Sequence, residues 1–279
     1  MAPSPNLQRL HEAGVSIWLD TLSRRLLESG EFAELIGDYS VTGATSKPTI
    51  FAKAITDSDG LPAIQELTRR GVNINVTLLF SVERYEQVVE AYLRGLDARV
   101  QAGEALDSIA LVASFFLSRI DAAVDAQLPE GSPLCGRVAL ASARVAYQRC
   151  LARFAGPQWD RLDMAGVKRQ RPLCAGTGTK NPQYPDVHYV SGVIGPDVVN
   201  TMPEQTLRAF ADHGEVARTL DADAEAARRT LAATRAEGID LAAVTAQLER
   251  EGVLSFCDSY RELKRGIENK VDAATAVTG

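Results

Sequence analysis

Polar and charged residues follow several short apolar runs of this chain, at positions where they could act together. They are Asp20, residues 45–47, Asn75, Thr77, Ser114, Arg119, residues 177–180 and Asn200. A carboxylate can move protons, a lysine amine can attack a carbonyl carbon when its pKa is lowered, and an arginine can bind two oxygens of a phosphate group. These residue types therefore allow acid–base and nucleophilic chemistry beside an anionic group.

The apolar runs that precede these residues are typical of buried parallel strands, because they are rich in β-branched residues and do not alternate with polar ones. They span residues 15–20, 39–45, 72–80, 108–116, 171–178 and 196–203. Helical patterns separate them, so we expect a parallel sheet with helices outside. Polar residues at the carboxyl ends of many strands favour a (β/α)8 barrel. No glycine-rich nucleotide-binding loop follows the first strands, so a doubly wound nucleotide-binding sheet has no support.

Several helix boundaries can also be predicted. One helix should run from an N-cap at Ser81 to Gly103, and a second should cover residues 132–156. Thr201 and Glu204 have the spacing of a capping box. From residue 215 onward the chain reads as helix.

The strand count falls short of a complete barrel, which has eight strands. The gap between Thr45 and Asn73 holds one loop and one helix. The gap between Phe116 and Arg171 reads as one or two helices. The sequence therefore predicts a TIM-barrel-type α/β fold that is reduced by about two strands.

Composition excludes several classes of protein. The net charge is −6 and the pI is near 5.3, which argues against nucleic-acid and anionic-membrane partners. There is no apolar run of about 20 residues and no charged segment followed by an apolar one, so we expect neither a membrane span nor a secretory signal. The four cysteines and three histidines lack the spacing of metal ligands. We therefore expect reduced thiols in a cytoplasmic protein, and no metal site.

Several strand ends carry motifs of a known family. They read VSIWLDTLSR, VTGATSKPTIFAKAI, GVNINVTLLFSVERY, VASFFLSRID and GVIGPDVVNTMPEQTL. In this order they resemble transaldolase of the longer actinobacterial type, and the resemblance runs almost end to end. It implies one α/β barrel domain over residues 1–279 with C-terminal helices. It also implies transfer of a dihydroxyacetone unit between sugar phosphates through a lysine Schiff base, without metal or organic cofactor.

The chain departs from this family in two places. The family carries two further strands between the IFAKAI and GLPAI motifs, one with a catalytic glutamate and one with the Schiff-base lysine. Here IFAKAITDSDGLPAI joins the two sides directly. In addition, the family's TSNP motif is TSKP in this chain, so that Lys47 replaces an asparagine.

A census of the six lysines singles out Lys47 as the candidate nucleophile. Lys264 and Lys270 belong to the C-terminal helix, Lys168 precedes a strand, and Lys53 should face outward. Lys180 follows a strand in the region where the family binds phosphate. The alternative is that Lys47 is a solvated loop residue or a phosphate anchor, and that no Schiff base forms.

The resemblance assigns roles to other strand-end residues. Asp20 would accept the proton of the C4 hydroxyl during C–C cleavage, although it could instead cap the following helix. Asn75 would bind a substrate hydroxyl, and Thr77 an ordered catalytic water. Asp57 and Asp59 are weak candidates to replace the missing glutamate, because they also fit a turn.

Ser114, Arg119 and Lys180 match the family's contacts to the substrate hydroxyl and phosphate groups. Arg119 could instead pair with Asp121 on the surface. Gly176 stands where the family more often has a serine. The donor ketose phosphate would be fructose 6-phosphate or sedoheptulose 7-phosphate, and the acceptor an aldose phosphate.

Two alternatives stay open. The chain could be a catalytically impaired relative that binds sugar phosphates. The missing strands could be accommodated by a six-stranded barrel or by a partner chain, for which a homodimer is one arrangement.

Overall fold

The computed structural model describes residues 4–20, 29–44 and 60–278. In these ranges one sheet contains six strands: β1 (Val15–Leu19), β2 (Val41–Ala44), β3 (Ile74–Leu79), β4 (Leu111–Phe116), β5 (Arg171–Ala175) and β6 (Val198–Met202). All of the pairings are parallel. Each strand lies inside one of the predicted apolar runs, so these six predictions are confirmed.

The strand order identifies the type of sheet. It is β2-β1-β6-β5-β4-β3, so the first strand pairs with the last. The strands β2 and β3 are consecutive in the sequence but lie at opposite edges of the sheet. A barrel has a circular strand order, and this is the order of a barrel opened between β2 and β3. The predicted α/β fold of the barrel type is confirmed, and the described residues contribute six strands to it.

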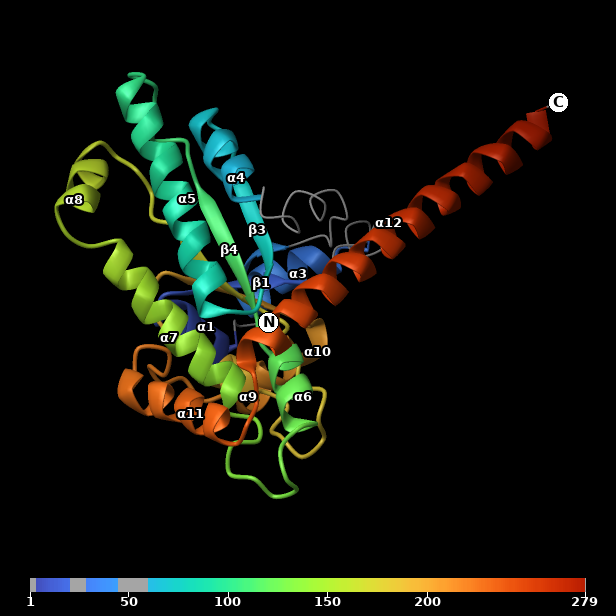
Figure 1. Cartoon of the computed structure of the whole chain (residues 1–279). Helices are drawn as coiled ribbons and strands as arrows, with labels where there is room; N and C mark the ends of the chain where they lie inside the picture. The colour runs from blue at the N-terminus through green and yellow to red at the C-terminus, as the bar shows by residue number, and fades with distance from the viewer. Residues whose placement is uncertain (1–3, 21–28, 45–59, 279) are drawn as a thin grey trace.

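The helices that precede, connect and follow the strands are named in Figure 1. They are α1 (Pro5–Glu12), α3 (Glu31–Tyr39), α4 (Gly60–Arg69), α5 (Val82–Gln101), α6 (Ser118–Asp125), α7 (Val138–Arg153), α8 (Pro157–Met164), α9 (His188–Gly192), α10 (Glu204–His213), α11 (Ala224–Ala236) and α12 (Leu241–Thr278). The carboxyl-terminal part of α12 extends away from the rest of the protein (Figure 1). Among the described residues, we find no helix with the length and apolar character to span a membrane.

The helix α5 forms as its sequence predicts. The Ser81 hydroxyl accepts a hydrogen bond from the Arg84 amide at 3.1 Å, which satisfies one of the free amides at the start of the helix. The side chains of one face are buried in the core; they include Tyr85, Val88, Val89, Tyr92 and Leu96. This face packs against the sheet and α4.

Three helix predictions are wrong in their boundaries. The helix expected from residue 132 begins at Val138, because Gly136 has a left-handed backbone with φ of +69°. Thr201 is not an N-cap, since it belongs to β6 and lies opposite Trp18; Pro203 takes the N-cap position instead. Residues 214–223 are not helical, and Asp223 caps α11 by accepting from the Ala226 amide.

The two faces of the sheet have different surroundings. The helix-covered face carries the two larger apolar clusters. The opposite, inner face holds a small cluster in which Leu173, Ala175 and Val199 contact Trp18, Val112 and Phe116. Gly43 allows this packing, because a Cβ atom there would lie 2.7 Å from the Trp18 ring. Helices on one face and side chains on the other are the layers of a barrel.

Candidate active site at the carboxyl ends of the strands

The strand register decides which side chains share the inner face. Ser114 lies opposite Leu173, Leu173 opposite Val199, and Val199 opposite Ser16. Because side chains alternate along a strand, the same face also receives Trp18 and Asn75. The polar members of this face therefore come from several strands, as the sequence predicts.

Asn75 and Ser114 are in direct contact. The Ser114 hydroxyl donates a hydrogen bond to Oδ1 of Asn75 at 2.7 Å. Ser114 is buried, whereas Asn75 is exposed because β3 is an edge strand. Because the Asn75 oxygen accepts this bond, its NH2 group is left as the donor that can serve a ligand. The structure thus brings together two residues predicted to bind a substrate hydroxyl.

Thr77 lies at an irregular point of β3. The register with β4 shifts between Val76 and Leu79, and Leu78 has φ of +63°. Leu78 is buried beside Gly252 of α12. Bulges of this kind redirect side chains and are common beside active sites. Thr77, on the bulge, is partly exposed.

Asp20 continues the ladder of β1 beyond its last residue. Its amide donates to the Met202 carbonyl oxygen at 3.2 Å, and its side chain is partly buried. This places Asp20 at the carboxyl end of the strand, as predicted. The candidate nucleophile Lys47, the two candidate carboxylates Asp57 and Asp59, and the helix that Asp20 was expected to cap lie outside the described residues.

Arg119 is in the first turn of α6 and is partly buried. The predicted alternative, an ion pair with Asp121, is wrong. Asp121 is completely buried, and its two oxygens accept from the Ala139 amide at 2.8 Å and the Tyr189 hydroxyl at 3.0 Å. Burial raises the pKa of Asp121 to about 7. Arg119 therefore has no carboxylate from Asp121 to neutralise it.

Lys180 is exposed in the segment that follows β5. The other described lysines are elsewhere: Lys168 precedes β5, and Lys264 and Lys270 belong to α12. Of the lysines in the described ranges, Lys180 alone follows the carboxyl end of a strand. Gly176, in the same segment, has φ of +63°, which explains glycine where the family more often has serine.

Two polar contacts were not predicted from the sequence. The Thr177 hydroxyl lies 2.8 Å from the Thr201 carbonyl oxygen and 3.1 Å from Oδ1 of Asn200, which ties the end of β5 to β6. At the opposite end of the inner face, the Arg171 guanidinium donates to the Ser16 hydroxyl at 2.5 Å. Arg171 and Leu173 are two positions apart on β5 and therefore point to the same face. This spacing could have placed Arg171 on the inner face from the sequence.

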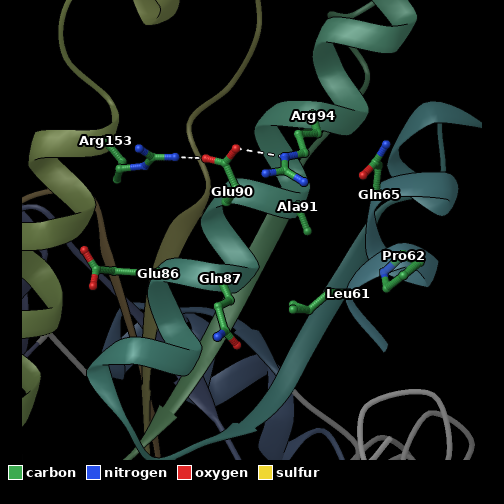
Figure 2. Close-up of a pocket in the computed structure, with 9 residues that line it drawn as sticks. All are labelled: Leu61, Pro62, Gln65, Glu86, Gln87, Glu90, Ala91, Arg94 and Arg153. Atoms are coloured by element: carbon green, nitrogen blue, oxygen red, sulfur yellow. Dashed lines mark hydrogen bonds and ion pairs between the residues drawn. The ribbon is translucent and has the colours of Figure 1, made fainter. Parts of the chain in front are cut away.

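Two surface grooves lie away from these residues. One groove of about 590 Å³ runs between α4, α5 and α7. Figure 2 shows Glu90 in this groove between the guanidinium groups of Arg153 and Arg94, with which it forms ion pairs. A second groove of about 470 Å³ lies between α5, α7, α11 and the start of α12. Neither is lined by a predicted site residue.

Comparison with known proteins identifies the family. A sequence model described as transaldolase/fructose-6-phosphate aldolase matches residues 54–267. The chain belongs to this transaldolase family. It is 36% identical to a transaldolase of Frankia alni, over 92% of this chain and 95% of the relative. It is also 36% identical to a transaldolase of Saccharopolyspora erythraea, over 98% of this chain and the whole relative.

The transaldolase relatives are longer than this chain. The two alignments extend over 352 and 365 residues, whereas the chain has 279. A third, with a transaldolase of Mycolicibacterium smegmatis, extends over 369 residues at 35% identity. These relatives therefore contain residues with no counterpart here. This agrees with a sheet that is open between β2 and β3.

Proposed function

We propose that the chain is a transferase that moves a dihydroxyacetone unit from a ketose phosphate to an aldose phosphate, as in the transaldolase reaction. The observation that carries this proposal is the match to proteins named transaldolase over nearly their full length. The contact between Asn75 and Ser114 on the inner face supports it, because both match family contacts to a substrate hydroxyl. Fructose 6-phosphate and sedoheptulose 7-phosphate are the proposed donors.

The proposed reaction begins at Lys47. Its neutral amine attacks the C2 carbonyl carbon of the ketose phosphate, and loss of water gives a protonated Schiff base. Asp20 then accepts the proton of the C4 hydroxyl while the C3–C4 bond breaks. The aldose phosphate product leaves. The enamine that remains attacks the aldehyde carbon of the acceptor, while Asp20 returns its proton to the aldehyde oxygen. Hydrolysis of the new Schiff base, with the water held by Thr77, releases the product ketose phosphate.

Arg119 and Lys180 are the proposed ligands of the substrate phosphate. Its position supports this role, because Arg119 lies in the first turn of α6, shortly after the end of β4, and is not paired with Asp121. A planar guanidinium can donate to two phosphate oxygens, and a lysine adds a second positive charge.

Borohydride trapping tests the nucleophile. Wild-type protein incubated with fructose 6-phosphate and then reduced should gain the mass of one dihydroxyacetone adduct. Lys47→Ala should gain none, whereas Lys53→Ala should behave like wild type. Trapping that persists in Lys47→Ala would remove Lys47 from the reaction.

A second candidate function is sugar-phosphate binding without transfer. The observation that favours it is the absence, among the described residues, of any lysine other than Lys180 at a strand's carboxyl end. In that case no adduct forms in wild type, yet fructose 6-phosphate raises the melting temperature. Transfer activity in a coupled assay would exclude this candidate.

We further propose a single domain over residues 1–279, a homodimer and a location in the cytoplasm. The four cysteines are free thiols, which supports a reducing compartment.

A further inference from the structure

The proposed phosphate ligands are carried by two separate elements. Arg119 belongs to α6, and Lys180 belongs to the segment between β5 and α9. A phosphate group can be bound by both only if these elements are held at a fixed separation. The contacts between them are therefore of interest, and the inference drawn from them rests on the proposed function.

The two elements are joined where they begin. The Leu117 amide donates to the Ala175 carbonyl oxygen at 3.0 Å, and the Ser118 amide donates to the Gly176 carbonyl oxygen at 3.1 Å. These bonds continue the pairing of β4 with β5 up to the start of α6. These two bonds hold only the beginning of the Lys180 segment, and they do not attach its later residues to α6.

A second attachment lies at the last residue of α6. Oδ2 of Asp125 accepts from the Tyr184 hydroxyl at 2.6 Å, and Oδ1 of the same residue accepts from the Gly136 amide at 3.1 Å. Asp125 thus joins the segment before α7 and the segment that carries Lys180. One turn earlier, Asp121 has the same pattern, with Tyr189 and the Ala139 amide.

The Lys180 segment is itself a compact turn. The Thr179 hydroxyl lies 3.0 Å from the Pro185 carbonyl oxygen and 3.2 Å from that of Asp186. The Tyr184 amide donates to the Asn181 carbonyl oxygen at 3.1 Å. These bonds join the residues on either side of Lys180 to Tyr184 and its neighbours, so the position of Tyr184 is linked to that of Lys180 through the turn.

Gly136 shapes the second attachment. A Cβ atom at this position would lie 2.8 Å from the Tyr184 ring, and the backbone there is left-handed with φ of +69°. Glycine thus lets the ring approach the chain closely enough for its hydroxyl to reach Asp125. The Tyr184 ring also lies against His188, at 5.4 Å between centroids.

We propose that Asp125 and Tyr184 are positioning residues for the substrate phosphate, which hold the Lys180 turn against the Arg119 helix. Tyr184 suits this role better than Tyr189, because Tyr184 is partly exposed beside the site whereas Tyr189 is a core residue. Neither Asp125 nor Tyr184 touches the reacting carbon atoms. Their loss should weaken recognition of the phosphate and leave the sugar contacts intact.

Binding measurements with inorganic phosphate, fructose 6-phosphate and fructose test this proposal. In Tyr184→Phe, the dissociation constants of both phosphate-containing ligands should rise about tenfold, while fructose binding stays unchanged. Asp125→Ala should behave similarly. Asp125→Asn should stay near wild type, because an amide can still accept from Gly136 and donate to the Tyr184 oxygen. In a transfer assay, KM should rise and kcat should change little.

Tyr92→Phe is the matched control, because the Tyr92 hydroxyl donates a bond of 2.8 Å to the Lys168 carbonyl oxygen before β5. It should leave phosphate binding unchanged. Normal phosphate affinity in Tyr184→Phe, or equal weakening of fructose, would overturn the proposal. If the proposed phosphate site itself is wrong, the result differs: Arg119→Ala and Lys180→Ala then bind phosphate with normal affinity. The measurement with inorganic phosphate does not depend on Schiff-base formation, because phosphate has no carbonyl group.

Discussion

Asp121 is a carboxylic acid without solvent contact, held by one amide and one tyrosine hydroxyl. Burial raises its pKa from 3.8 to about 7. The folded protein therefore holds this proton more tightly than the unfolded chain between about pH 4 and pH 7, so stability is lost as pH rises through this range. Each unit by which folding raises the pKa of Asp121 corresponds to at most about 1.4 kcal/mol of unfolding free energy.

We therefore expect Asp121→Asn to gain stability relative to wild type as pH increases. The asparagine has a similar shape, stays neutral, and can still accept from Ala139. Between pH 5 and pH 8, the melting temperature of the variant minus that of wild type should rise by several degrees. Asp163→Asn, which removes an exposed carboxylate of α8, controls for the loss of one charge. A difference in melting temperature that stays constant with pH would contradict this prediction.

Single residues differ in how far they could be predicted. Asn75 could be placed on the same side of its strand as Thr77, because the alternation of side chains along a strand is a local property of the sequence. The partners of Asp121 could not, since Tyr189 is 68 positions away and its approach depends on how α6, α7 and α9 pack. An aspartate and an arginine that are close in sequence need not form an ion pair, because the fold can bury one of them and leave the other near solvent.

At the scale of elements, the contact of α4 with α5 supports the edge strand β3. Gly95 of α5 allows this contact, because a Cβ atom there would lie 2.6 Å from Cβ of Thr68 and 2.7 Å from the Gln65 carbonyl oxygen. The second neighbour is backbone, so the two helices would have to separate. Since α4 also precedes β3 in the chain, the separation would disturb the strand that carries Asn75.

Gly95→Ala should therefore destabilise the protein although alanine is the better helix former. Overpacking costs about 1–3 kcal/mol, which exceeds the helix-propensity gain of about 1 kcal/mol. We expect a fall in melting temperature of about 2–6 °C. The matched control is Gly266→Ala in α12, where no atom lies within 4 Å of the new methyl group; it should not lower the melting temperature. Equal behaviour of the two variants would refute this packing argument.

Element boundaries show a related limit of sequence reasoning. The start of α5 was predictable because Ser81 caps its own helix. The start of α7 was not, because Gly136 bonds to Asp125 and lies against Tyr184, 48 positions further along the chain. Helical periodicity before Val138 therefore gave the wrong boundary.

At the scale of the whole molecule, the strands of the described residues have the order of a barrel opened between β2 and β3. The β3 edge leaves Asn75 exposed, although this residue faces the inner side. The short connection between β2 and β3 was visible in the sequence, as was the count of six strands. The opening between β2 and β3 is a place where a partner chain can pack.

The projecting part of α12 supports a second copy of the chain as that partner. Leu254, Tyr260 and Ile267 are 63%, 45% and 54% exposed, and this part extends away from the body (Figure 1). Tyr260 and Ile267 are one heptad apart and so share a face. Isolated helices gain little stability without packing. From residue 254 onward the sequence has four acidic and four basic residues, so net charge does not oppose pairing of two copies.

We therefore predict a dimer in sedimentation experiments at micromolar concentration. The double variant Tyr260→Lys with Ile267→Lys should shift it to monomer, because four lysines would meet at the shared face. Ser255→Lys with Glu262→Lys places two lysines with the same spacing on the opposite face of α12 and should leave the dimer intact. A monomeric wild type would contradict the prediction. Equal loss of dimer in both variants would place the contact away from the face of Tyr260 and Ile267.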